Sequence, residues 1–132
     1  MDLLARLPDP RHTVLLYGTT PPRLGTPQDQ VDAAVEKLAQ RVAPLPLDGI
    51  VVYDIQDESG RTAAPRPFPF VGTIDPRAYS RLLAARLGKP ALTYKSLGAL
   101  TEDAWRGWLA ESREQFGTQF LSVVGRPTSG VK

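Results

Sequence analysis

Residue types capable of proton transfer and anion binding gather in four short stretches of this 132-residue chain. A carboxylate can accept or donate a proton, and arginine beside hydroxyl groups suits a phosphate or a carboxylate. These groups can act together only if the fold brings the four stretches to one place. The stretches hold Thr19, Thr20 and Arg23; Asp54, Gln56, Asp57, Glu58 and Arg61; Tyr94, Lys95 and Ser96; and Arg126, Thr128 and Ser129.

Asp54 is the best single candidate for proton transfer, because it directly follows the all-apolar segment 49–53. A carboxylate at such a strand end could accept a proton or bind a hydroxyl or amine of a ligand. The alternative is an ordinary acid that caps a loop amide. Arg126 with Thr128 and Ser129 suits a phosphate, and the alternative there is a plain surface turn.

Each stretch is preceded by a short apolar segment, and the first three are followed by a helix with clear start signals. We predict strands at 13–17, 49–53, 90–94 and 119–124 and helices at 27–42, 76–87 and 102–116. The expected N-caps of the three helices are Thr26, Asp75 and Thr101, and a short extra helix is expected at 1–7. The two tryptophans of the last helix, three residues apart, predict core packing, with a binding platform as the alternative. They belong to a stripe on one helix face: Trp105, Trp108, Leu109, Ser112 and Phe116.

This alternation predicts an α/β fold made of parallel β/α units. Segment 49–53 is apolar at every position, which is typical of a parallel strand covered on both faces. Two architectures fit: an open doubly wound sheet, or the first half of a TIM-type (β/α)8 barrel. We favour the half barrel, because no glycine-rich phosphate loop follows the first strand. Residues 1–132 would then be one domain of four units, either a fragment or the partner of a second half.

Composition excludes several classes of function. The chain has no cysteine and one histidine, His12, so a thiolate or histidine-rich metal site is not expected. Its formal net charge is only +2, and no basic block marks a nucleic-acid surface. No apolar run approaches the roughly 20 residues that span a bilayer. We therefore expect a cytoplasmic protein with a small-molecule substrate, no nucleic-acid or membrane partner, and either a homo-oligomer or a missing C-terminal half.

Three of the four strand ends resemble the methylenetetrahydrofolate reductase family of flavin-dependent barrels. The phrase Leu15–Arg23, with its Pro-Pro-Arg, is similar to the end of that family's first strand. The segment Val51–Tyr53 and the later Gly-Arg-Thr at 60–62 look like its second strand and loop. Val123–Pro127 stands where the family has an Arg-Gly-Asp turn. The resemblance covers about residues 12–132 and implies the first half of a barrel.

The chain departs from this family at three functional positions. The family's first-strand glutamate, its proposed acid toward the folate, falls on Gly18. Its flavin-contacting histidine falls on Ala91, and its turn aspartate falls on Arg126. The fold therefore carries over better than the reaction. Gly18→Glu would be the direct test, on the expectation that a glycine leaves room at the strand end.

The resemblance also implies a ligand set. FAD is the expected cofactor, and Asp54 is the candidate catalytic residue. The implied cofactor-binding residues are Tyr53, Thr93, Gly125, Arg126, Thr128 and Ser129. The implied substrate-binding residues are Thr19, Thr20, Arg23 and Gln56. Two functions stay open: a flavin oxidoreductase acting on a folate or related one-carbon substrate, or a non-catalytic ligand-binding or assembly module that has lost the reductase acid.

Overall fold

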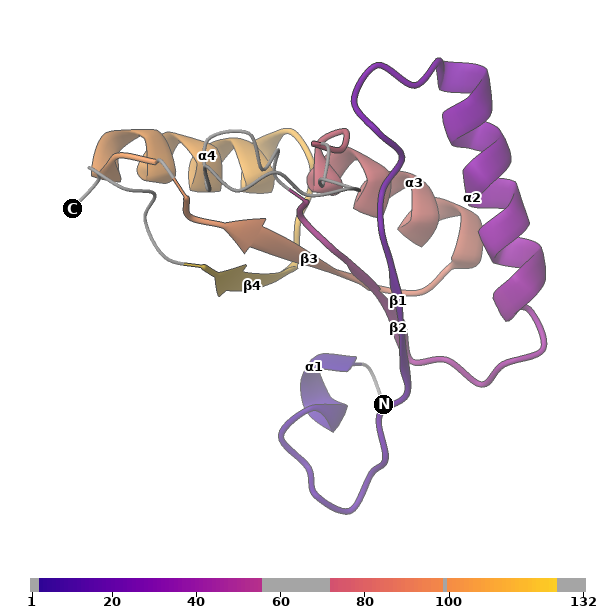
Figure 1. The fold of residues 1–132 in the computed structure, drawn as a ribbon. Coiled ribbons are helices and arrows are strands. Elements are labelled where there is room, and N and C mark those ends of the chain that lie inside the picture. Colours follow the sequence, from indigo (N-terminus) through magenta and orange to yellow (C-terminus); the bar gives the residue numbers. More distant parts are fainter. Residues whose placement is uncertain (1–2, 56–71, 99, 126–132) are drawn as a thin grey trace, which may run out of the picture.

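The computed structural model describes residues 3–55, 72–98 and 100–125. Within these ranges, strands and helices alternate along the chain after a short N-terminal helix (Figure 1). The elements are α1 (Leu3–Arg6), β1 (Leu16–Thr19), α2 (Gln28–Val42), β2 (Gly49–Val52), α3 (Pro76–Leu87), β3 (Ala91–Ser96), α4 (Glu102–Glu114) and β4 (Phe120–Val124).

The four strands form one parallel sheet in the order β1-β2-β3-β4. Each crossover helix therefore advances the sheet in the same direction, and right-handed crossovers then place the helices on a single face. Figure 1 shows α2, α3 and α4 on that face and α1 on the opposite one. This confirms the α/β class and the parallel β/α units. A sequential sheet covered on one face is compatible with half of a barrel.

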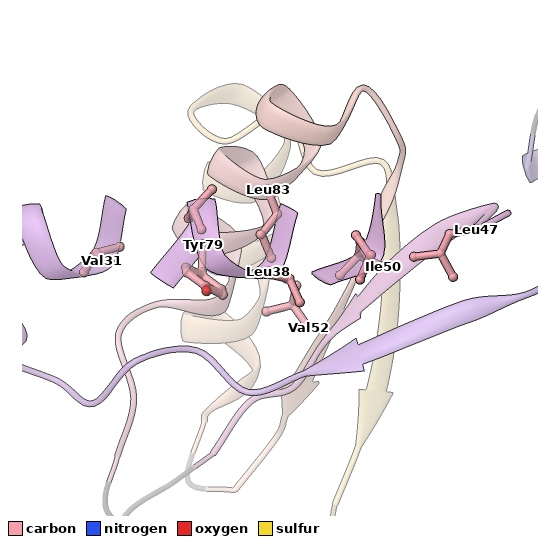
Figure 2. Packing of buried hydrophobic residues seen from close by; sticks show 9 residues of the cluster. Val31, Leu38, Leu47, Ile50, Val52, Tyr79 and Leu83 are labelled. Carbon is pink, nitrogen blue, oxygen red and sulfur yellow. The ribbon is translucent and has the colours of Figure 1, made fainter. Parts of the chain in front are cut away.

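The core lies between the sheet and helices α2 and α3. Figure 2 shows Tyr79 and Leu83 of α3 pointing toward Ile50 and Val52 of β2. Leu83 and Val52 are fully buried, and Ile50 is 1% exposed. Helix α2 contributes the stripe Val31, Val35, Leu38 and Val42, at the three- and four-residue spacing that puts side chains on one helix face.

Two of the three predicted N-caps are confirmed. The side chain of Asp75 accepts a hydrogen bond from the Arg77 amide, and Thr101 accepts one from the Ala104 amide. The prediction for α2 is wrong by one residue. Helix α2 begins at Gln28 with Pro27 as its N-cap and no side-chain cap bond. The Thr26 hydroxyl instead donates to the Arg23 carbonyl at 2.6 Å, which stabilises the preceding turn.

The remaining differences from prediction lie at element ends and in α4. Strand β1 begins at Leu16 rather than 13, and β3 extends to Ser96. Within α4 only Ser112 is buried, so its stripe does not pack as a core face. Trp105 and Trp108 instead stack on each other with ring centroids 5.4 Å apart.

Candidate functional site

The open face is the face of the sheet opposite helices α2, α3 and α4. Strand register decides which side chains lie on it. Successive side chains of a strand point to opposite faces. Val52 and Thr93 are register partners that point toward the helices. Val51 and its partner Leu92 therefore belong to the open face, as does Gly18, which pairs with Val51 in the β1–β2 ladder.

Helix α1 covers the amino-terminal end of the open face. Leu3 is 5% exposed. A Cβ built on Gly49, at the start of β2, would lie 3.5 Å from Leu3 Cδ2 and 3.3 Å from Leu16 Cδ2. The nearest atom to that Cβ would be the Pro90 carbonyl oxygen, at 2.9 Å, so the glycine accommodates the neighbouring strand, while the contact with Leu3 would be ordinary packing. Within the described ranges, the uncovered part of this face is the end at which all four strands terminate, here called the carboxyl edge.

Three residues at the carboxyl edge form what we call the aromatic corner: Gly18, Tyr53 and Tyr94. The two tyrosine rings meet edge to face, with centroids 5.4 Å apart and an interplanar angle of 84°. A Cβ built on Gly18 would overlap the Tyr53 hydroxyl and lie 2.8 Å from its Cζ. The Tyr53 ring therefore lies directly over Gly18, and Tyr53 remains 38% exposed.

This geometry corrects the expectation that Gly18 leaves room for a glutamate. The space above the Gly18 Cα is filled by the Tyr53 phenol, so Gly18→Glu would first have to displace that ring. The tyrosine is held by its backbone as well, since the Tyr53 amide donates to the Thr19 carbonyl at 3.0 Å. The space at the position that the resemblance matches to an acid is thus occupied by the phenol of the residue that follows β2.

The loop after β1 is held at the same edge. The Ile74 amide donates to the Pro22 carbonyl at 2.9 Å, and the Leu24 amide donates to the Gly72 carbonyl at 3.0 Å. Arg23 lies between these two bonds and is exposed, as is Thr20. These contacts place Thr20 and Arg23, two of the predicted substrate-binding residues, at the carboxyl edge. The third, Thr19, ends β1 but is the register partner of Val52, so its side chain points toward the helices.

Asp54 follows the aromatic corner but its carboxylate is nearly buried, with 4% of the side chain exposed. Its Oδ2 accepts a hydrogen bond from the Ser96 amide at 2.8 Å and lies 3.9 Å from Lys95 Nζ. The Lys95 ammonium lies 5.1 Å above the Trp108 ring. Asp54 therefore caps an amide in the way that the alternative interpretation expected, and a role in proton transfer stays a prediction.

Thr93 does not join the aromatic corner. It is 1% exposed, and its hydroxyl lies 2.7 Å from that of Ser80 on α3. Both hydroxyls are thereby satisfied beneath the helix. Gly125 does lie at the carboxyl edge, with φ of 98°, and a Cβ built there would lie 3.0 Å from Ser96 Oγ. Gln56, Arg126, Thr128 and Ser129 lie outside the described residues.

Arg77 is a central residue that the sequence analysis missed. Its side chain is 4% exposed and donates to Asp75, to Glu111 and to the Ser112 hydroxyl. The guanidinium also lies 4.4 Å from the ring centroids of both Trp108 and Phe116. It therefore joins α3 to α4. Nothing in the sequence distinguished Arg77 from a surface arginine. Asp75 lies only two residues before it, and Glu111 lies on another helix.

Arg77 also governs the acidity of Asp75. Burial favours the neutral acid and alone would raise the pKa of Asp75, but the hydrogen bonds and charge of Arg77 outweigh burial. The pKa of Asp75 is therefore lowered from its ordinary value of 3.8. This network stabilises the packing of α4, and it lies on the helix side of the sheet rather than on the open face.

A cavity of about 970 Å³ lies between α1, α3 and the loop that leads into β4. Several of its polar side chains have partners within the protein. Arg6 pairs with Asp48, Arg81 donates to the Gln115 carbonyl, and the Ser80 and Thr93 hydroxyls bond each other. Arg6 Nε, however, is buried without a hydrogen-bond partner among the described residues.

Two searches of the described residues complete this survey. No group of three or more His, Cys, Asp or Glu side chains lies close enough to hold a metal ion in the described ranges. None of the helices in those ranges is long and apolar enough to cross a membrane.

Comparison with known proteins links the chain to a folate-binding protein. No protein-family model and no curated protein sequence matches it. One solved structure with a similar fold is described as an uncharacterized protein from Clostridium thermocellum that binds two copies of 5-methyl-5,6,7,8-tetrahydrofolic acid. The two chains are 28% identical, with a TM-score of 0.63 over 89% of this chain. The match covers 35% of that protein's length. Membership in the methylenetetrahydrofolate reductase family stays a prediction.

Proposed function

We propose that this chain is a folate-binding α/β module and that its ligand lies on the open face at the aromatic corner. The observation that carries the proposal is the 28% identical neighbour, which binds methyltetrahydrofolate. We propose that the chain binds its ligand without reducing it, which is the alternative that the sequence analysis left open. Gly18, which has no titratable group, supports this choice, since general acid catalysis is commonly worth about 100- to 10,000-fold.

The aromatic corner supports the proposal because its chemistry suits a reduced folate. A reduced pterin has a flat pyrimidine ring, fused to a puckered saturated ring, with hydrogen-bond donors and acceptors along its edge. Tyr53 and Tyr94 present an apolar ring with a polar hydroxyl, and such side chains stack on flat ligands while bonding their edges. Arg23, exposed at the same edge, could pair with a carboxylate of the glutamate tail.

Flavin-dependent reduction of a folate is a more specific hypothesis. Only some of the residues implied to bind FAD lie where they could do so. Tyr53 and Gly125 lie at the carboxyl edge, but the Thr93 hydroxyl is bonded to Ser80 beneath α3 and faces away from it. We therefore derive no reaction step through FAD. A visible absorption spectrum of the purified protein tests the hypothesis, since a bound flavin is coloured and a folate-only protein would lack its visible band.

We also propose that the open face is covered in the working protein, as expected of half a barrel. The sheet edges at β1 and β4 have no further strand beside them in the described ranges. Val123 and Val124 of β4 are each 42% exposed, and unpaired edges of this kind are usually protected. Light scattering on the isolated chain should show self-association. A compact monomer that unfolds cooperatively would count against the half-barrel proposal.

Titration calorimetry with 5-methyltetrahydrofolate tests the proposed function. We expect saturable binding by the parent protein and at least tenfold weaker binding by Tyr94→Ala, which removes half of the aromatic corner. Leu109→Ala is the matched control, because Leu109 is exposed on α4, on the helix side of the sheet. Loss of binding in both variants, or no binding by the parent, would contradict the proposal.

A further inference from the structure

Gly18 and Tyr53 form a matched pair across two strands. In the β1–β2 ladder Gly18 pairs with Val51, so Tyr53, two residues further along, is its diagonal neighbour. Aromatic side chains can reach such diagonal positions. Here the Tyr53 phenol lies directly above the Gly18 Cα, in the space where any other residue would place its Cβ. Gly18 has no positive φ that would by itself favour glycine. The space taken by Tyr53 explains the glycine.

A ring over a strand glycine also has a purely structural explanation. Aromatic side chains cover glycines at sheet edges and thereby replace the missing packing. Phenylalanine would serve that purpose as well as tyrosine. The Tyr53 hydroxyl makes no hydrogen bond with the part of the chain that the structure describes, unlike the paired hydroxyls of Ser80 and Thr93. Its position above an exposed glycine gives it access to a ligand on the open face.

We infer that Tyr53 is a specificity-determining residue of the open face, with Gly18 as the residue that positions it. This inference rests on the proposed function and names the group that recognises the ligand. The phenol exchanges a hydrogen bond with the polar edge of a heterocycle such as the pterin of a reduced folate. The glycine is required because an alanine there would push the phenol away from this position.

The inference predicts a distinct pattern among four variants. Tyr53→Phe keeps the ring and removes only the hydroxyl, so we expect about three- to tenfold weaker binding of 5-methyltetrahydrofolate, the usual worth of one hydrogen bond. Gly18→Ala displaces the ring and should weaken binding by about tenfold or more. Tyr17→Phe and Gly107→Ala are the controls and should change affinity less than twofold. Tyr17 faces the helix side, and a Cβ on Gly107 meets open space.

Coupling between the two positions provides the second measurement. In a Tyr53→Ala background the clash is gone, so adding Gly18→Ala should cause no further loss of affinity. Because Tyr53 can move as a side chain, Gly18→Ala is expected to fold, and the circular dichroism spectrum checks this.

The outcomes separate the inference from the proposed function. If the parent binds and Tyr53→Phe binds equally well, the tyrosine only covers the glycine, and the inference is wrong while the proposed function stands. If Gly18→Ala weakens binding equally in both backgrounds, Gly18 does not act through Tyr53, which also overturns the inference. No binding by the parent overturns both.

Discussion

The two faces of the sheet are built from alternate residues of the same strands, yet they differ in packing and in polar chemistry. On the helix face, Val52 is fully buried and the Thr93 hydroxyl is bonded to Ser80. On the open face, Tyr53 is 38% exposed and its hydroxyl has no partner among the described residues. The comparison indicates that the helix face stabilises the fold, and we propose that the open face takes a ligand and a covering partner.

The largest expected effect concerns packing on the helix face. Leu83→Ala should lower the free energy of unfolding by about 2–5 kcal/mol, because Leu83 is fully buried and its removal leaves a cavity. Leu92→Ala, on the half-buried open face, should cost much less in the isolated chain. Urea denaturation measures both. Equal losses would show that the open face is packed in solution and would contradict the comparison.

The next effect concerns the Arg77 network on the helix side. Arg77→Ala should destabilise the chain by about 2 kcal/mol, since it removes charged hydrogen bonds and leaves Asp75 and Glu111 without their partner. Breaking a fully buried ion pair would cost more, but the side chains of Asp75 and Glu111 are 36% and 44% exposed and can be solvated. Thermal unfolding provides the measurement. Arg106→Ala, in an exposed pair on α4, is the control and should cost under about 1 kcal/mol.

Thr93→Val separates the two roles considered for Thr93. The variant leaves the buried Ser80 hydroxyl without its partner, so we expect a loss of about 1–2 kcal/mol in stability. Ligand affinity should stay within twofold of the parent, because Thr93 faces the helices. If affinity fell strongly while stability held, Thr93 would belong to the ligand site, and the assignment of the two faces would be wrong.

The smallest expected effect is the pH dependence of the Asp75–Arg77 contact. The pKa of Asp75 is lowered in the folded state, so its contribution to stability is complete above the ordinary value of 3.8. That contribution is lost as the pH falls below 3.8 and through the lowered pKa. Between pH 6 and 2, the free energy of unfolding from denaturation curves should therefore decrease less with falling pH for Asp75→Asn than for the parent. Parallel curves would contradict this role.

Most of the fold could be predicted because its signals are local. Capped starts at Asp75 and Thr101 and the all-apolar segment 49–53 were sufficient for the parallel β/α order. The start of α2 was misplaced because Thr26, a good cap by type, bonds the preceding turn instead. The packing of α4 was misjudged because its anchor, Arg77, lies on another helix.

The candidate site was harder to predict because it depends on contacts between strands. Matching the sequence to the reductase family position by position placed Gly18 where the family has an acid. Such a match could not show that the Tyr53 ring fills the space above Gly18. It also grouped Thr93 with Tyr53, although strand alternation puts them on opposite faces. A glycine in one strand with a tyrosine two residues beyond its register partner is the signal that could have revealed the aromatic corner.

Mapping of amide shifts during titration tests the central claim most directly. Addition of 5-methyltetrahydrofolate to ¹⁵N-labelled protein should move the resonances of residues 17–20, 51–54 and 92–95 at the carboxyl edge. The amides of the middle of α2 and of Arg81 and Ala84, the α3 side of the cavity, should stay unchanged. Shifts confined to that cavity, or no shifts at millimolar ligand, would contradict binding on the open face.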